Sequence, residues 1–104
     1  MKLHVSVRSS DPNVASEIAQ VKIEGVTIKK SLTIREIEKP PIDFLVYIGE
    51  HVVLPIVVSL IARKLYDILK GRKDNKLTIQ NQPVEINTQK IEQLILISLK
   101  EKEE

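Results

Sequence analysis

The first twenty residues predict a strand followed by a short helix. Apolar and polar side chains alternate over residues 2–8, a period of two that is typical of a strand with one buried face. The apolar positions are Leu3, Val5 and Val7. Asp11 can accept hydrogen bonds from the free amides of a first helical turn, and Pro12 has no amide to leave unpaired. We therefore expect a helix over about 12–20.

The alternation returns over residues 21–37, where one or two strands are expected. Its apolar positions are Val21, Ile23, Val26, Ile28, Leu32, Ile34 and Ile37. Gly25 shifts the phase of the pattern, as a turn or a bulge does. The dipeptide Pro40-Pro41 then separates this segment from the next.

The longest apolar run covers residues 44–62, and we predict one long central helix over 44–70. Pro55 cannot donate to the carbonyl of His51, so the helix either kinks there or restarts with Pro55 in its first turn. After Pro55 the polar side chains follow one stripe, which consists of Ser59, Arg63, Asp67 and Lys70. The remaining apolar circumference is too wide for a single sheet to cover, so the helix needs cover from two sides.

The next segment predicts a hairpin after a helix stop at Gly71. Its apolar positions are Leu77, Ile79, Val84 and Ile86. A four-residue turn over Gln80–Pro83 would pair Ile79 with Val84 and place the apolar side chains on one face. A two-residue loop at Asn81-Gln82 is less favourable, because Pro83 would cost the flanking pair an amide donor.

The last segment predicts a helix that begins near Asn87 or Thr88, either of which can cap it. Its buried stripe consists of Ile91, Leu94, Ile95 and Leu99. Leu96 and Ile97 point elsewhere and add further surplus apolar surface. Residues 99–104 are expected to form a frayed, charged tail.

The order of elements predicts an α+β fold, β-α-β(β)-α-β-β-α. We expect a small mixed sheet of about four strands, packed on the long apolar central helix and the C-terminal helix. A chain of 104 residues has room for one domain, so residues 1–104 are expected to form a single domain. A chain of this size buries only about two-thirds of its unfolded surface. With no Trp or Cys, the core must be largely aliphatic.

Several classes of site are excluded or disfavoured by residue type. A chain with no Cys forms no disulfide or thiolate metal site, and two His are too few for a recognisable zinc site. The isolated glycines form no phosphate-binding loop. Glu50 and His51 are adjacent, but neighbours on a helix diverge by about 100°, so they cannot pair in catalysis. We expect no catalytic residues, no metal and no cofactor.

Basic residues gather in one stretch although the net charge is only +2. The cluster consists of Arg63, Lys64, Lys70, Arg72, Lys73 and Lys76. These side chains could contact the phosphates of a nucleic acid. None of the three aromatic residues lies in a basic stretch, however, and binding to single strands usually relies on stacked aromatics. A solvated charged surface is the favoured interpretation.

The run 44–62 is also long enough for a membrane span. Glu50, His51 and Pro55 near its middle would be costly in lipid, so a core helix with oligomeric cover is favoured and a membrane is disfavoured as a partner. Met1–Arg8 alternates between apolar and polar residues, whereas a signal peptide has a continuous apolar stretch. We therefore expect a cytoplasmic protein. Abundant Lys, Glu and Ile with no Cys is typical of thermophile proteins.

The order of elements resembles the effector-associated constant component family, small proteins encoded beside variable effector domains in prokaryotic conflict systems. The segments that carry the resemblance, over most of the chain, are Lys2–Arg8, Glu36–Pro41, Ile61-Ala62-Arg63-Lys64-Leu65, Gly71-Arg72-Lys73, the hairpin Leu77–Ile86 with its Pro-Val-Glu-Ile, and Ile91–Leu99. Glu50, His51 and Pro55 inside the helix depart from the pattern, as does the Lys/Ile-rich composition. The resemblance implies an adaptor or structural role and no catalytic residues.

The surplus apolar surface predicts a non-enzymatic interaction module that self-associates, most simply as a two-fold symmetric dimer. The expected interface residues are Val52, Val53, Ile56, Val57, Leu60, Leu96 and Ile97. A different protein partner, nucleic acid at the basic cluster, and a membrane at 44–62 are the alternatives.

Overall fold

The computed structural model describes residues 1–11, 13–30, 42–72 and 74–102. Its elements are β1 (Lys2–Arg8), α1 (Asn13–Ala19), β2 (Val26–Lys30), β3 (Ile42–Ile48), α2 (Leu54–Leu69), β4 (Lys76–Ile79), β5 (Gln82–Val84) and α3 (Thr88–Lys102). The predicted α+β class and order of elements are confirmed. The sheet has five strands where about four were predicted, and the described strands pair in antiparallel fashion throughout rather than forming a mixed sheet.

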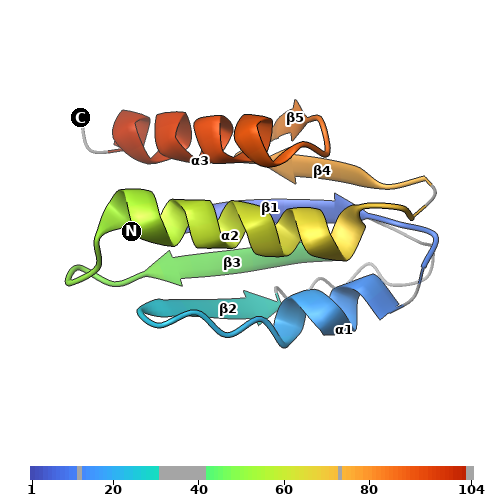
Figure 1. Ribbon diagram of the computed structural model, residues 1–104, viewed down its shortest axis with the longest axis horizontal. Coiled ribbons are helices and arrows are strands. Elements are labelled where there is room, and N and C mark those ends of the chain that lie inside the picture. Colours follow the sequence, from blue (N-terminus) through green and yellow to red (C-terminus); the bar gives the residue numbers. More distant parts are fainter. Residues whose placement is uncertain (12, 31–41, 73, 103–104) are drawn as a thin grey trace.

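The strands lie in the order β2-β3-β1-β4-β5, with β1 at the centre. Each of α1 and α2 joins two strands that are separated in the sheet by one antiparallel neighbour: β3 lies between β1 and β2, and β1 lies between β3 and β4. This is the split β-α-β arrangement of ferredoxin-like folds. The strand β5 and the helix α3 extend that unit at one edge (Figure 1).

The three helices lie on one face of the sheet, and none of the described elements covers the other face, here called the open face (Figure 1). The predicted alternation in β1 is confirmed, because Leu3, Val5 and Val7 are buried while the side chains between them are half-buried. The core contains one aromatic ring and is otherwise aliphatic, as predicted. Its largest fully buried members are Phe44, Leu3, Ile18, Leu69, Leu77, Ile79, Ile91, Ile95 and Leu99.

The predicted central helix over 44–70 is wrong in its first third, where Ile42–Ile48 forms β3. Phe44, Val46 and Ile48 alternate toward the helices and are buried. Leu45 and Tyr47 on the other face are also largely apolar, so the strand reads as a continuous apolar run whose period does not distinguish it from a helix. The helix α2 starts at Leu54 with Pro55 in its first turn, which confirms the second of the two alternatives for that proline.

Residues 21–25 form no strand of the sheet: Ile23 makes an isolated bridge with Val26, and the chain turns at residues 24 and 25. The amide of Val26 donates to the carbonyl of Ile23 at 3.0 Å, and β2 begins at Val26. Gly25 has a φ of +82°, which side-chain-bearing residues rarely adopt, and it lies in a turn, the first of the two alternatives predicted there. The strand positions predicted beyond Lys30, and the Pro40-Pro41 boundary, lie outside the described residues.

The hairpin forms, but its predicted register is wrong. Val84 pairs with Leu77 rather than Ile79, and Ile79 pairs with Gln82 across a two-residue loop. Gln80 and Asn81 in this loop have φ values of 50° and 65°, the left-handed pair of a type I′ turn. Pro83 costs no ladder bond, since its pair with Thr78 follows a hydrogen-bonded pair and its nitrogen therefore faces the outer edge of β5.

The helix α3 begins as predicted. The side-chain oxygen Oδ1 of Asn87 accepts from the amide of Lys90 at 3.1 Å, which caps the first turn. The expected stripe packs inward, with Ile91, Ile95 and Leu99 fully buried and Leu94 half-buried. The helix extends to Lys102 and so includes part of the predicted tail.

Candidate interaction surfaces

Exposed apolar side chains follow one line along the start of α2. Val53, Ile56 and Leu60, here called the α2 stripe, are 62%, 58% and 41% exposed. Their spacing of three and four residues places them on the same side of the helix. The nine residues Leu54–Ala62 contain no charged side chain, so nothing ionic interrupts this surface. Large side chains of this kind are usually buried.

The α2 stripe forms one wall of an open groove of about 620 Å³. The groove is also lined by Ile23, Glu24 and Gly25 from the turn before β2, and by the connection from β3 to α2. The connection docks on this turn, since the amide of Gly49 donates to the carbonyl of Gly25 at 2.8 Å. This contact ties the segment that leads into α2 to the turn before β2.

The seven predicted interface residues divide into two groups. Val57 is only 5% exposed and belongs to the core, while Val52 and Leu96 are half-buried against it. Besides the α2 stripe, the structure exposes Ile97 on α3, at 51%. The two helices pack side by side and antiparallel, so the first half of α2 lies beside the second half of α3 (Figure 1).

The predicted basic cluster is divided among α2, the turn that follows it and β4. Arg63 and Lys64 are exposed on α2, whereas Lys76 is exposed on β4 in the sheet. Lys70 lies 3.4 Å from a carboxylate oxygen of Asp67 and is about half exposed. Lys73 lies outside the described residues.

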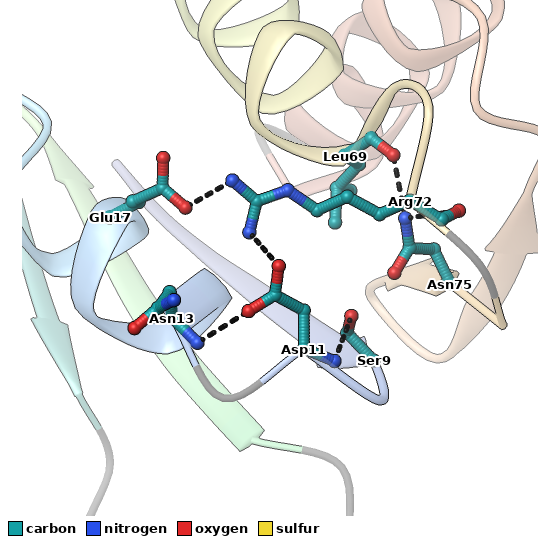
Figure 2. A network of polar contacts seen from close by, with 7 residues as sticks. All are labelled: Ser9, Asp11, Asn13, Glu17, Leu69, Arg72 and Asn75. Carbon is teal, nitrogen blue, oxygen red and sulfur yellow. Dashed lines mark hydrogen bonds and ion pairs between the residues drawn. The ribbon is translucent and has the colours of Figure 1, made fainter.

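Arg72, the remaining member of the cluster, belongs to an internal polar network (Figure 2). Its guanidinium donates to Oδ2 of Asp11 at 2.9 Å and to Oε2 of Glu17. Asp11 also accepts from the amide of Asn13 at 2.9 Å, as expected for a residue that starts α1. The guanidinium side chain is 23% exposed. Arg72 thus ties α1 to the end of α2, and its charge is already balanced by two carboxylates.

Asn75 closes the turn that carries Arg72. Its Nδ2 donates to the carbonyl of Leu69 at 2.6 Å and to the carbonyl of Arg72 at 3.0 Å (Figure 2). The first of these carbonyls belongs to the last turn of α2, where intrahelical donors run out. The basic turn predicted from the sequence is therefore a structural closure of the helix.

Glu50 and His51 lie in the turn between β3 and α2, not inside a helix as predicted. Both side chains are exposed. They border the groove beside the α2 stripe. The helical argument against a catalytic pair therefore does not apply to them, and they mark a polar end of the apolar groove.

The open face of the sheet is a surface that sequence reasoning did not assemble. The open sheet face consists of Lys2, His4, Ser6 and Arg8 of β1, Thr27 and Lys29 of β2, Asp43, Leu45 and Tyr47 of β3, Lys76 and Thr78 of β4, and Pro83 of β5. The polar half of β1 was visible in the alternation of residues 2–8. Tyr47 was missed because its segment was assigned to a helix.

No cluster of three or more His, Asp or Glu suited to hold a metal ion occurs among the described residues. None of the three helices described is long and apolar enough to cross a membrane, and the run 44–62 is divided between β3, a turn and α2. Comparison with protein-family models, with characterised proteins and with solved structures finds no match to this chain. The family resemblance noted in the sequence stays a prediction.

Proposed function

We propose that the chain is a cytoplasmic, non-enzymatic interaction module that self-associates through the outer side of α2 and α3. The observation that carries this proposal is the α2 stripe, three large apolar side chains in line that are 41–62% exposed. Isolated exposed apolar residues are common, but a contiguous patch on a small chain marks an interaction site. Ile97 on the neighbouring helix extends the apolar character to α3.

The helix pair has the size that a dimer contact needs. A standard interface buries about 800 Å² on each partner, about a ninth of the 7151 Å² surface of this chain. Helices of 16 and 15 residues are each about 24 Å long, and two of them about 10 Å apart present a face of that order. A two-fold axis through this face would set one α2 stripe against the other.

An adaptor role agrees with this surface, and it is also what the family resemblance implies. The alternatives at the same elements have less support. Arg72 is engaged by Asp11 and Glu17, which removes the most buried cation from the proposed phosphate cluster. The 44–62 run supplies only part of a helix.

The oligomeric state in solution tests the proposal. Light scattering at micromolar concentration should return twice the chain mass of 11.8 kDa. Ile56→Glu places a charge in the middle of the α2 stripe, and it should weaken association by about 2 kcal/mol and shift the mass toward one chain. Tyr47→Ala is the matched control, because Tyr47 is 38% exposed but lies on the open sheet face; it should leave the dimer intact.

A monomer mass for the unaltered chain would overturn the proposal. So would equal masses for the Ile56→Glu and Tyr47→Ala variants when both remain folded by circular dichroism.

A further inference from the structure

We propose that the open sheet face binds single-stranded nucleic acid, with Tyr47 as the base-stacking group and the surrounding cations as phosphate contacts. This site lies on the side of the sheet opposite the α2 stripe and does not depend on self-association. It also differs from the basic cluster at 63–76, with which it shares only Lys76.

The charged residues of the strands are almost all basic. The five strands contain five Lys or Arg residues and a single acidic residue, Asp43. Lys30 pairs with the buried Phe44 and so lies on the helix side, which leaves four of the five cations on the open sheet face. The whole chain has 16 basic and 14 acidic residues, which leaves 11 and 13 outside these strands. The basic excess of the protein therefore resides in the sheet. A polyanion is the partner that such a surface complements.

Asp43 is the acidic side chain on the described part of the open sheet face. One of its carboxylate oxygens lies 3.5 Å from Nε2 of His4, its neighbour on β1. Arg8 and Lys76, in contrast, are directly opposite each other on β1 and β4, and both are exposed. Like charges in this arrangement repel. In the part of the chain that the structure describes, neither forms an ion pair. A bound phosphate between them would relieve the repulsion.

Tyr47 supplies an aromatic ring beside basic side chains, although no aromatic residue lies in a basic stretch of the sequence. It lies on β3 opposite Lys2 on one side and Thr27 on the other. The Nζ atom of Lys29 lies 5.8 Å from the centroid of its ring. Stacking of bases on an aromatic ring, within a basic groove that follows the backbone, is how single strands are bound without sequence preference.

The spacing also suits a short single strand. The row of Lys2 and Tyr47 is separated from the row of Arg8 and Lys76 by six residues of β1, which is about 20 Å at 3.3 Å per residue. This length accommodates roughly four nucleotides, the lower end of the site sizes known for OB-fold domains. Duplexes offer no unstacked base to Tyr47, so a single strand is the favoured form.

Fluorescence anisotropy of labelled oligonucleotides tests this proposal. Single strands of uridine or thymidine about twelve nucleotides long, in about 50 mM salt, should bind, and a duplex of the same length should bind more weakly. The two single strands distinguish an RNA from a DNA ligand. Tyr47→Ala should weaken binding on the order of tenfold, while Tyr47→Phe, which keeps the ring, should bind as the unaltered chain does.

A pair of charge-matched double variants distinguishes the open sheet face from general electrostatic attraction. Arg8→Gln with Lys76→Gln should weaken binding and lower the slope of log affinity against log salt by about 0.7, the value for the one phosphate that lies between them. Arg63→Gln with Lys64→Gln removes the same charge from α2 and should change neither. Amide chemical shifts on titration should move in β1, β3 and β4 rather than in the helices, a readout that needs no variant.

Three outcomes would overturn the proposal. The first is no binding of either single strand at low salt. The second is a folded Tyr47→Ala variant that binds like the unaltered chain. The third is an equal loss from the α2 double variant and the sheet double variant.

Discussion

Gly25 and Gly71 both have a left-handed backbone, but only at Gly25 would an added Cβ also collide with a neighbour. Alanine substitutions at the two positions therefore separate the cost of the backbone conformation from the cost of the collision. Gly25 and Gly71 have φ values of +82° and +74°, and a Cβ in this region costs about 1–2 kcal/mol. A Cβ at Gly71 would meet no atom within 4 Å, whereas at Gly25 it would lie 2.3 Å from Cγ1 of Val52. Overpacking of this kind costs about 1–3 kcal/mol more. We expect Gly71→Ala to cost about 1–2 kcal/mol and Gly25→Ala about 2–5 kcal/mol.

The additional cost of Gly25→Ala over Gly71→Ala should disappear when the side chain of Val52 is shortened. Val52→Ala deletes the Cγ1 atom, so Gly25→Ala introduced into that variant should cost only the backbone preference, as at Gly71. Urea denaturation followed by circular dichroism gives the four free energies of unfolding that this cycle needs. All variants must be compared at one protein concentration, because association would add to stability. An equal cost of Gly25→Ala with and without Val52→Ala would refute the reasoning.

Two further substitutions test the network and the strand assignment. Arg72→Gln should lower the free energy of unfolding by about 1 kcal/mol, because its two ion pairs are partly exposed. The loss should shrink in high salt, and Arg63→Gln on exposed α2 should show no such loss; urea melts at two salt concentrations measure both. Phe44→Ala should cost about 3–5 kcal/mol in the same melts because Phe44 is fully buried. Leu45→Ala, which alters the half-buried open face, should cost clearly less, and similar losses would contradict the alternation of β3.

Local patterns predicted the elements whose signals are self-contained. The alternation of residues 2–8 placed β1 correctly, because every second side chain in that strand is polar. Asp11 and Asn87 marked the starts of α1 and α3 through the hydrogen bonds that their side chains accept. Pro55 marked the first turn of α2 as one of two alternatives. In each case the deciding chemistry lies within a few residues of the chain.

Elements whose faces depend on distant partners were not predictable in this way. The strand β3 lies between β1 and β2, and apolar residues on both of its faces hide the alternation that identifies a strand. The loop Gln80–Asn81 contains no glycine, so its left-handed pair of residues carried no signal. Gln80 is held there by β1: its amide donates to the carbonyl of His4, and its Oε1 accepts from the amide of His4.

Dependence on residues that are distant in the sequence also explains why one of the two proposed surfaces could be predicted from sequence more readily than the other. The α2 stripe runs from the N-cap of α2 into the helix, so helical spacing alone groups Val53, Ile56 and Leu60. The open sheet face draws on all five strands, and Tyr47 meets Lys29 only because β3 pairs with β2. Arg8 and Lys76 are 68 positions apart in the chain and adjacent in the sheet. A short stretch of sequence never contains both members of such a pair, so local patterns cannot predict it.

The two surfaces lie on opposite sides of the sheet, and this arrangement makes the two proposals separable. A second copy seated on α2 and α3 would meet the helical side, so the open face of each protomer would point away from the contact. A dimer formed through the open faces would instead bury Tyr47 and exclude an oligonucleotide. Tyr47→Ala should therefore change binding without changing mass, and Ile56→Glu should change mass without changing the affinity of one site for a short strand. If either substitution altered both properties while the chain stayed folded, the separation of the two sides would be wrong.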